Sequence, residues 1–158
     1  MRKGIWAVPV MAALTVGLGA SPASAASQTV NRPVTPYNIP NTLISYAPAN
    51  SSAGWHIGDC YEELGYLFLE RPVLTNGVWI GKIRWAFNMY TAHTSNFDQW
   101  HMKWTFRTAS GSQIHVLGPV DGPRMVTGHD YSDERPYDAY ITPAVFDSIR
   151  SVDWNGAC

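Results

Sequence analysis

Residues Gly77 to Leu117 read GVWIGKIRWAFNMYTAHTSNFDQWHMKWTFRTASGSQIHVL and hold most of the aromatic side chains from which the fold can be predicted. Apolar and polar residues alternate with a period of two along Val78–Thr91 and again along Asp98–Thr108. This alternation is typical of β-strands that bury one face. The apolar positions, which we expect in the core, are Trp79, Gly81, Ile83, Trp85, Phe87 and Met89 in the first strand and Trp100, Met102, Trp104 and Phe106 in the second.

We expect these two strands and a third to form an antiparallel meander, in which each strand pairs with the next along the chain. A turn at Ala109-Ser110-Gly111 would join the second and third strands, because glycine supplies a left-handed residue without strain. Cross-strand aromatic pairs would then stabilise the sheet by roughly 0.2–1 kcal/mol each. Between the first and second strands the expected cross-strand pairs are Phe87–Met102, Trp85–Trp104 and Ile83–Phe106. Between the second and third strands they are Thr108–Ser112, Phe106–Ile114 and Trp104–Val116.

Proline, glycine and turn residues divide the rest of the chain into shorter elements. We expect a helix capped by Thr142 at Pro143–Ser148 and a closing strand at Ile149–Trp154. The other expected elements are strands at Thr42–Tyr46, Tyr66–Glu70 (ended by Pro72) and Arg124–Thr127, a turn at Thr75-Asn76-Gly77, and loops at Gly118–Pro123 and Gly128–Tyr137. This pattern predicts an all-β fold, an antiparallel β-sandwich with one short helix near the C-terminus.

Residues 1–25 have the features of a secretory signal peptide. Arg2-Lys3 forms a basic start, Ile5–Ala20 is mostly apolar, and Ala23-Ser24-Ala25 matches a cleavage site of small residues. No second long apolar run follows, so we expect a secreted protein without a membrane span.

The mature chain would be acidic. Without Arg2 and Lys3, the 11 basic residues of the chain fall to 9 against 12 acidic ones, which gives a formal net charge of −3. This balance argues against nucleic-acid binding, which needs a basic surface. We expect one β-sandwich domain over residues 51–158.

The two cysteines, Cys60 and Cys158, are expected to form a disulfide, because cysteine pairs in exported proteins usually oxidise. The bridge would close a loop of roughly 100 residues and stabilise the fold by about 4.7 kcal/mol in the chain-entropy model. The alternative, two free catalytic thiols, is disfavoured for the same reason.

Residues 26–50 are interrupted by four prolines, which favour an extended conformation. We expect either a loosely attached terminus or an N-terminal arm that adds to the sheet or cleft of a partner. On the second interpretation the partner-binding residues of this arm are Val30, Arg32, Val34, Tyr37 and Ile39.

A second candidate surface is the polar side of the meander, where four basic residues would lie close together. Like charges opposite one another destabilise a sheet, so the cluster needs an anionic neighbour. The neighbour would be either a carboxylate of this chain (Glu62, Glu63, Glu70 or Asp98) or an acidic protein partner or anionic glycan. The basic candidates for partner binding are Lys82, Arg84, Lys103 and Arg107.

The sequence contains no catalytic or nucleotide-binding motif, so we expect no enzyme activity and no cofactor. The five histidines are dispersed, without the close spacing of zinc ligands. The acidic residues of the 128–138 loop lack the ordered spacing of a calcium loop. We therefore expect no metal site.

The chain has a Pro-interrupted arm at about Ala26–Pro40, followed by a small Trp-rich β-domain that ends in Cys158. It is similar to the adaptor subunits of the umbrella-shaped antibacterial toxin particles of filamentous actinobacteria. The resemblance implies a secreted, non-enzymatic adaptor that joins extracellular protein partners, with its N-terminal extension in a cleft of one of them.

Two other functions stay open from the sequence. An extracellular protease inhibitor would present a rigid loop, either Gly118–Pro123 or Gly128–Tyr137. A carbohydrate-binding module or small hydrolase would stack an exposed ring, such as Trp55 or Tyr90, on a sugar.

Overall fold

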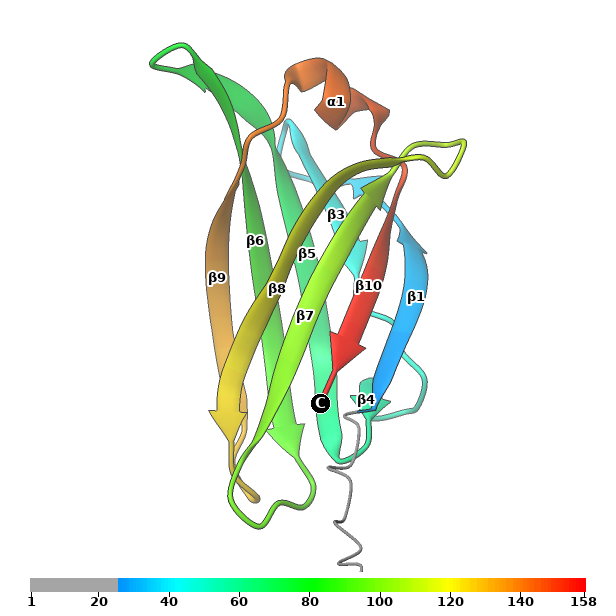
Figure 1. Ribbon diagram of the computed structural model, residues 1–158, viewed down its shortest axis with the longest axis vertical. Helices are drawn as coiled ribbons and strands as arrows, with labels where there is room; N and C mark the ends of the chain where they lie inside the picture. Colours follow the sequence, from blue (N-terminus) through cyan, green and yellow to red (C-terminus); the bar gives the residue numbers. More distant parts are fainter. Residues whose placement is uncertain (1–25) are drawn as a thin grey trace, which may run out of the picture.

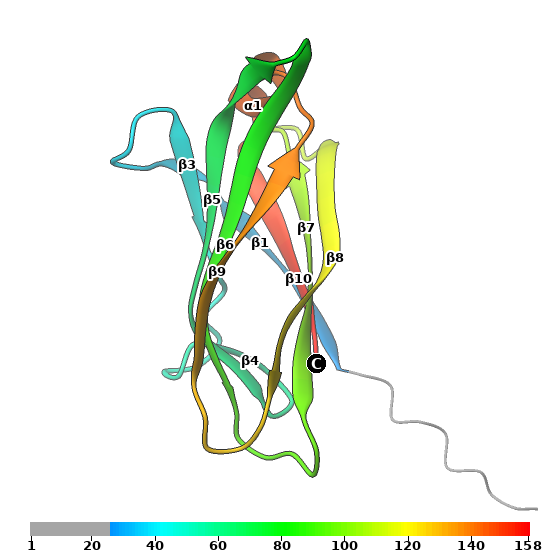
Figure 2. The same ribbon diagram turned by 90° about the vertical axis from the view of Figure 1, so that its left-hand side faces the viewer.

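The computed structural model describes residues 26–158, so the expected signal peptide at 1–25 lies outside the described residues. The chain forms two antiparallel sheets that pack face to face, with one short helix across one end (Figures 1 and 2). Sheet A has the strand order β1-β10-β7-β8, and sheet B has the order β2-β3-β5-β6-β9, with β4 paired to β5. The predicted all-β sandwich is confirmed.

The bounds of the elements are as follows. Sheet A contains β1 (Ser27–Pro33), β7 (Asp98–Arg107), β8 (Gln113–Met125) and β10 (Ser151–Ala157). Sheet B contains β2 (Thr35–Pro36), β3 (Thr42–Tyr46), β4 (Trp55–Ile57), β5 (Cys60–Thr75), β6 (Val78–Thr91) and β9 (Tyr131–Ala139). The helix α1 spans Pro143–Ser148.

The core lies between the sheets and contains most of the apolar set predicted from the alternation. The inward positions of β6 and β7 are buried, apart from Trp79, which is 38% exposed near the end of its hairpin. The largest fully buried side chains include five tryptophans: Trp55, Trp85, Trp100, Trp104 and Trp154.

The predicted meander is wrong in one respect, because β6 and β7 are not neighbours. β6 pairs with β5 and β9 in sheet B, whereas β7 pairs with β10 and β8 in sheet A. Trp85 and Trp104 do meet, with ring centroids 5.1 Å apart, but they meet across the interior of the sandwich. Alternation identifies the buried face of each strand, and both strands bury theirs in the same core from opposite sides.

The β7–β8 turn agrees with the prediction near its tip and departs from it further down. The Thr108 N–H donates to the Ser112 carbonyl over 3.0 Å, as a loop at 109–111 requires. An irregularity between Phe106 and Arg107 then shifts the register, so that Phe106 pairs with His115 and not with Ile114. A β-bulge adds one residue to a strand, which changes every pair beyond it. Trp104 likewise pairs with Leu117 instead of Val116.

Two strands are longer than predicted because bulges accommodate their prolines. β5 continues past Pro72 with a shift between Glu70 and Val73, and β8 includes the segment 118–123 that was expected to be a loop. Proline lacks the N–H that a ladder requires, so it is tolerated at bulges and edges. The expected turn before β6 is present, with positive φ at both Asn76 and Gly77. This is the conformation of a two-residue type I′ hairpin.

The predicted C-terminal helix has the bounds of α1, whereas the closing strand, expected at Ile149–Trp154, spans Ser151–Ala157 because Ile149 caps the helix. The Thr142 hydroxyl accepts a hydrogen bond from the Val145 N–H over 3.3 Å and caps α1. Strand β10 then runs between β1 and β7 and brings Cys158 to Cys60, with Cα atoms 6.2 Å apart. The predicted disulfide is confirmed.

Residues 26–50 differ from the expected free arm. β1 pairs with β10 along its whole length, from Ser27–Ala157 to Pro33–Ser151, and β3 pairs with β5 in the other sheet. Pro33 and Pro36 fall on the edge strands β1 and β2, where a missing N–H costs no ladder hydrogen bond, and Pro40 and Pro48 lie between strands. The segment is therefore part of both sheets of the sandwich.

Candidate functional site

The arm residues selected from the sequence do not form one surface. Val30 and Arg32 are half-buried in β1, and Val34 packs against the core with its N–H bonded to the Arg150 carbonyl. Ile39 is 50% exposed in the turn between β2 and β3. Tyr37 differs from the others, because its ring contacts Phe68 on the outer side of sheet B at a centroid distance of 5.2 Å.

The basic residues selected from the sequence are also separated. Lys82 and Arg84 lie on β6 in sheet B, whereas Lys103 and Arg107 lie on β7 in sheet A. The predicted cluster depended on β6 and β7 being neighbours, and because they are in opposite sheets their outer faces point in opposite directions.

Carboxylates of the chain itself neutralise three of these four residues. Arg84 bonds to both Glu70 and Glu134 at 2.9 Å, and these hydrogen bonds and charges raise its pKa. The remaining ion pairs are Lys82–Asp138 and Arg107–Asp153. Of the proposed intramolecular partners, Glu70 is the one that contacts this set.

Several loop and ring candidates are corrected by the structure. The segments 118–123 and 128–137, proposed as inhibitory loops, lie largely within β8 and β9. Trp55 is fully buried, with its Nε1 donating to Gln28 Oε1 over 2.6 Å, so it is inaccessible to a sugar. Tyr90 is half-buried and stacks on Tyr61, with centroids 4.7 Å apart.

The two sheets present very different outer faces. The outer side of sheet A is polar, with His101, Lys103, Thr105, Arg107, Asp153 and Asn155. The outer side of sheet B carries an aromatic face, which we define as Tyr37, Tyr46, Tyr61, Tyr66, Phe68 and Tyr90 together with Leu64. Antiparallel sheets commonly turn a polar face to water. The outer side of sheet A follows this pattern, whereas the rings on the outer side of sheet B depart from it.

The rings of the aromatic face hold one another in place. Tyr46 contacts Tyr66 edge-on at 5.4 Å, and Phe68 lies between Tyr66 and Tyr37. Edge-on and offset contacts of this kind each contribute about 0.5–1.5 kcal/mol beyond burial. The Arg84 guanidinium of β6 lies 4.8 Å from the Phe68 centroid, so the row of contacts runs from Tyr46 on β3 through the rings of β5 to β6.

A β-bulge raises the centre of this face. β5 has a register shift between Glu62 and Leu64, so that Glu63 and Leu64 are both exposed in succession. Leu64 is 54% exposed and, with Tyr66, separates two hollows. The larger has a volume of about 410 Å³ and is lined by Leu64, Tyr66, Ala86, Phe87, Asn88, Ser132 and Asp133. The smaller, about 160 Å³, lies on the side of Tyr46 and Pro48.

A row of polar groups joins the two hollows, with Asn88 and Ser132 lining the larger and Glu63 lining the smaller. The Asn88 amide donates to Glu63 Oε2 over 2.9 Å, and its oxygen accepts from the Ser132 hydroxyl over 3.0 Å. These three residues come from β5, β6 and β9, so the sheet holds them in line. The arrangement offers apolar ring surface beside fixed donors and acceptors, which suits binding.

Sequence reasoning missed the aromatic face. The available signal is the run Tyr66–Leu69, which is apolar or aromatic at every position instead of at alternate ones. Such a run predicts a strand with both faces covered or in contact with something.

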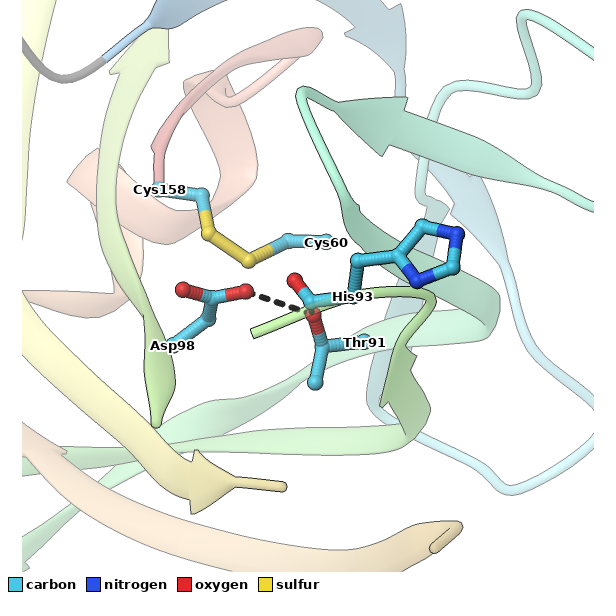
Figure 3. The surroundings of a disulfide bond; sticks show 5 residues. All are labelled: Cys60, Thr91, His93, Asp98 and Cys158. Atoms are coloured by element: carbon cyan, nitrogen blue, oxygen red, sulfur yellow. Dashed lines mark hydrogen bonds between the residues drawn. A yellow bond between two sulfur atoms is a disulfide. The ribbon is translucent and has the colours of Figure 1, made fainter. Parts of the chain in front are cut away.

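One further group of titratable residues surrounds the disulfide (Figure 3). An Asp98 carboxylate oxygen and the sulfurs of Cys60 and Cys158 lie within 4.8 Å of one another. The Thr91 hydroxyl contacts Asp98 Oδ2 at 2.5 Å, while the His93 ring points away from the bridge. Because both sulfurs are in the disulfide, this group fastens the end of β10 and offers no set of metal ligands.

Glu62 is an acid in the core. It is 1% exposed, its Oε1 accepts from Trp85 Nε1 over 3.0 Å, and within residues 26–158 its Oε2 has no hydrogen-bond partner. Burial raises its pKa to about 8, against a smaller lowering by the Trp85 hydrogen bond. Glu62 is thus protonated in the folded state at neutral pH.

Within residues 26–158 no helix is long and apolar enough to cross a membrane. Comparisons of the chain with protein-family models, with curated proteins and with solved structures gave no match.

Proposed function

We propose that the protein is a secreted, non-enzymatic binding protein, an adaptor that joins extracellular protein partners, and that the aromatic face of sheet B is a contact surface for one of them. The observation that carries this proposal is the group of rings on the outer side of sheet B, beside the ion pairs of β6 and β9, whereas the outer side of sheet A carries polar side chains. Tyrosine is enriched at protein interfaces and at their energetic centres, because one side chain offers both apolar area and a hydroxyl.

The rigidity of the face supports the same function. Its rings project from neighbouring strands and pack on one another, so few rotamers are lost when a partner binds. Ordering a mobile side chain at an interface costs about 0.5–1.5 kcal/mol, and a preformed surface avoids much of this cost. The exposed Leu64 and the hollow beside it provide relief on an otherwise flat sheet.

The Cys60–Cys158 disulfide is compatible with an extracellular protein, since such bridges persist in oxidising compartments. The resemblance in architecture suggests an antibacterial toxin complex as the setting. In this proposal the aromatic face takes the role that the sequence assigned to the N-terminal arm, because residues 27–33 are already paired with β10.

A second candidate function is carbohydrate binding, and the polar row favours it. Sugars are bound by a ring surface with adjacent hydrogen-bonding groups, and Glu63, Asn88 and Ser132 lie in line beside Tyr66. A module of this kind would use Tyr66 and Leu64 in place of the buried Trp55.

The test compares two surface variants of the secreted chain. The double variant Leu64→Ser/Tyr66→Ser alters the aromatic face, and Lys103→Ser on the polar face of sheet A is the matched control. Proteins that co-purify from the native culture medium are identified by mass spectrometry, and the affinity of the purified partner is then measured. We expect the control to bind like the wild type and the double variant to bind at least tenfold more weakly.

Equal binding by both variants would refute the aromatic face as the contact surface. A glycan array separates the two candidate functions. Binding of a neutral glycan that is lost in Asn88→Ala would replace the protein partner with a sugar.

A further inference from the structure

The end of the β5–β6 hairpin projects from the sandwich as a ribbon of two strands (Figures 1 and 2). β3 pairs with β5 only from Tyr66 to Glu70, and the pairing of β9 with β6 ends at Gly81. Beyond these points the two strands pair with each other alone. We name residues 72–81 the hairpin finger.

Both sides of the hairpin finger are apolar. The cross-strand pairs Val73–Ile80 and Leu74–Trp79 follow one another, so they point to opposite sides of the ribbon. Exposure is 67% for Val73, 58% for Leu74, 48% for Val78 and 38% for Trp79. A ribbon surrounded by water would be expected to carry polar residues on at least one side. Apolar residues on both sides indicate a surface that is covered in use.

The finger carries no charge between Pro72 and Gly81, and its base is neutralised. The flanking cations are Arg71, which pairs with Asp147, and Lys82, which pairs with Asp138. Its backbone edges are also open from Pro72 to Ile80, since the β3 pairing ends at Glu70 and the β9 pairing ends at Gly81. The occupant must therefore match an uncharged, apolar projection and tolerate polar backbone groups along its sides.

We propose that the hairpin finger inserts into an uncharged, apolar cleft of a second protein partner. A cleft contacts both sides of a convex ribbon and can bond to its open edges, as in recognition by strand addition. Two fingers of two copies would touch on one side each and leave the other side in water. A lipid surface fits less well, because the paired cations give no excess positive charge for anionic lipid and hydrocarbon cannot satisfy open strand edges.

This surface is separate from the aromatic face and does not depend on what that face binds. The finger extends past the end of sheet B, and its side chains belong to residues 73–80, whereas the aromatic face lies within the sheet. One rigid body with two distinct contact surfaces has the geometry that an adaptor requires.

The first step of the test is crosslinking from a photoreactive residue at position 74, in chain secreted into its native culture medium. The same residue at position 103, on the polar face of sheet A, is the control. We expect one heterologous crosslinked species from position 74 and none from position 103. The partner is then produced as a recombinant protein and serves as the probe in calorimetry.

In the second step we expect Leu74→Ser and Trp79→Ser to weaken binding of this probe at least tenfold. The aromatic-face variant Leu64→Ser/Tyr66→Ser should bind it as the wild type does. Thermal unfolding checks that each variant is folded. Leu74 and Trp79 are exposed, so replacing them should leave the core intact. Failure of the aromatic-face experiment would leave this result unchanged, so the two proposals fail separately.

Three outcomes would overturn the inference. The first is crosslinking from position 74 to a second copy of the chain alone, with a dimer in sedimentation analysis. The second is flotation of the protein with vesicles of phosphatidylcholine and phosphatidylglycerol that is lost in Trp79→Ser. The third is no crosslink, or equal affinity of the probe for the wild type and the finger variants.

Discussion

Replacing Glu62 by glutamine should remove most of the dependence of stability on pH between pH 5 and pH 8. The Glu62 carboxyl is buried and protonated in the fold, with a pKa of about 8 compared with an ordinary value of 4.5. Between these two values the folded chain holds a proton that the unfolded chain has released. The free energy of unfolding therefore falls as pH rises from 4.5 to about 8. Below pH 4.5 Glu62 is protonated in both the folded and the unfolded chain, so its contribution to stability has its full value there.

The size of the effect follows from the two pKa values. One pKa unit corresponds to 1.36 kcal/mol, so the whole window amounts to about 5 kcal/mol and the interval from pH 5 to pH 8 to about 3.5 kcal/mol. Glutamine keeps an oxygen that can accept from Trp85 Nε1 and has no proton to lose. Its amide leaves donors without partners, so we expect the variant to be less stable than the wild type at pH 5.

The assay is urea unfolding at pH 5, 6, 7 and 8, followed by tryptophan fluorescence. The difference between the wild type and Glu62→Gln should change by about 3–4 kcal/mol across the series in favour of the variant. Taking the difference between the two proteins cancels the contributions of other titrating groups. One of these is His115, whose pKa is lowered by burial. Glu63→Gln, at the exposed neighbouring position, is the control and should keep the wild-type slope. Parallel profiles for the wild type and Glu62→Gln would refute the assignment of a buried, protonated Glu62.

Three further predictions follow from the packing. Gly65→Ala should cost about 1–3 kcal/mol in urea unfolding, because its Cβ would meet the Glu62 carboxyl and lie 2.6 Å from the Ala47 Cβ; wild-type stability would contradict this. Asp98→Asn should speed reduction of the disulfide by dithiothreitol, since the carboxylate repels the attacking thiolate; an unchanged rate of thiol release would count against that role. Deleting residues 26–33 should lower the thermal midpoint by several degrees, because β10 loses an edge partner along seven register pairs; an unchanged midpoint would show that β1 is dispensable.

From the sequence one can predict the strands with sustained alternation and the side that each of them buries, but not β9 or the second half of β8, which were expected to be loops. The predicted strand Val78–Thr91 and helix Pro143–Ser148 have the bounds of β6 and α1. Period-two alternation, the turn at Asn76-Gly77 and the Thr142 cap are local features, and each depends on a few adjacent residues. The cysteine pair could also be predicted, because the chain contains two cysteines and each has one possible partner.

Which strands are neighbours could not be predicted from local sequence, and the surfaces of the protein depend on that strand order. Placing β6 and β7 in different sheets separates Lys82 from Arg107 and turns their expected cluster into ion pairs within each sheet. The bulges in β5 and β8 change the register of strand pairing, and the bulge in β5 exposes Leu64. Alternation alone does not predict these bulges. The physical reason is that a strand with one apolar face can bury it from either side of the same core. Strand order is then selected by the packing of the whole chain, and with it the aromatic face and the hairpin finger.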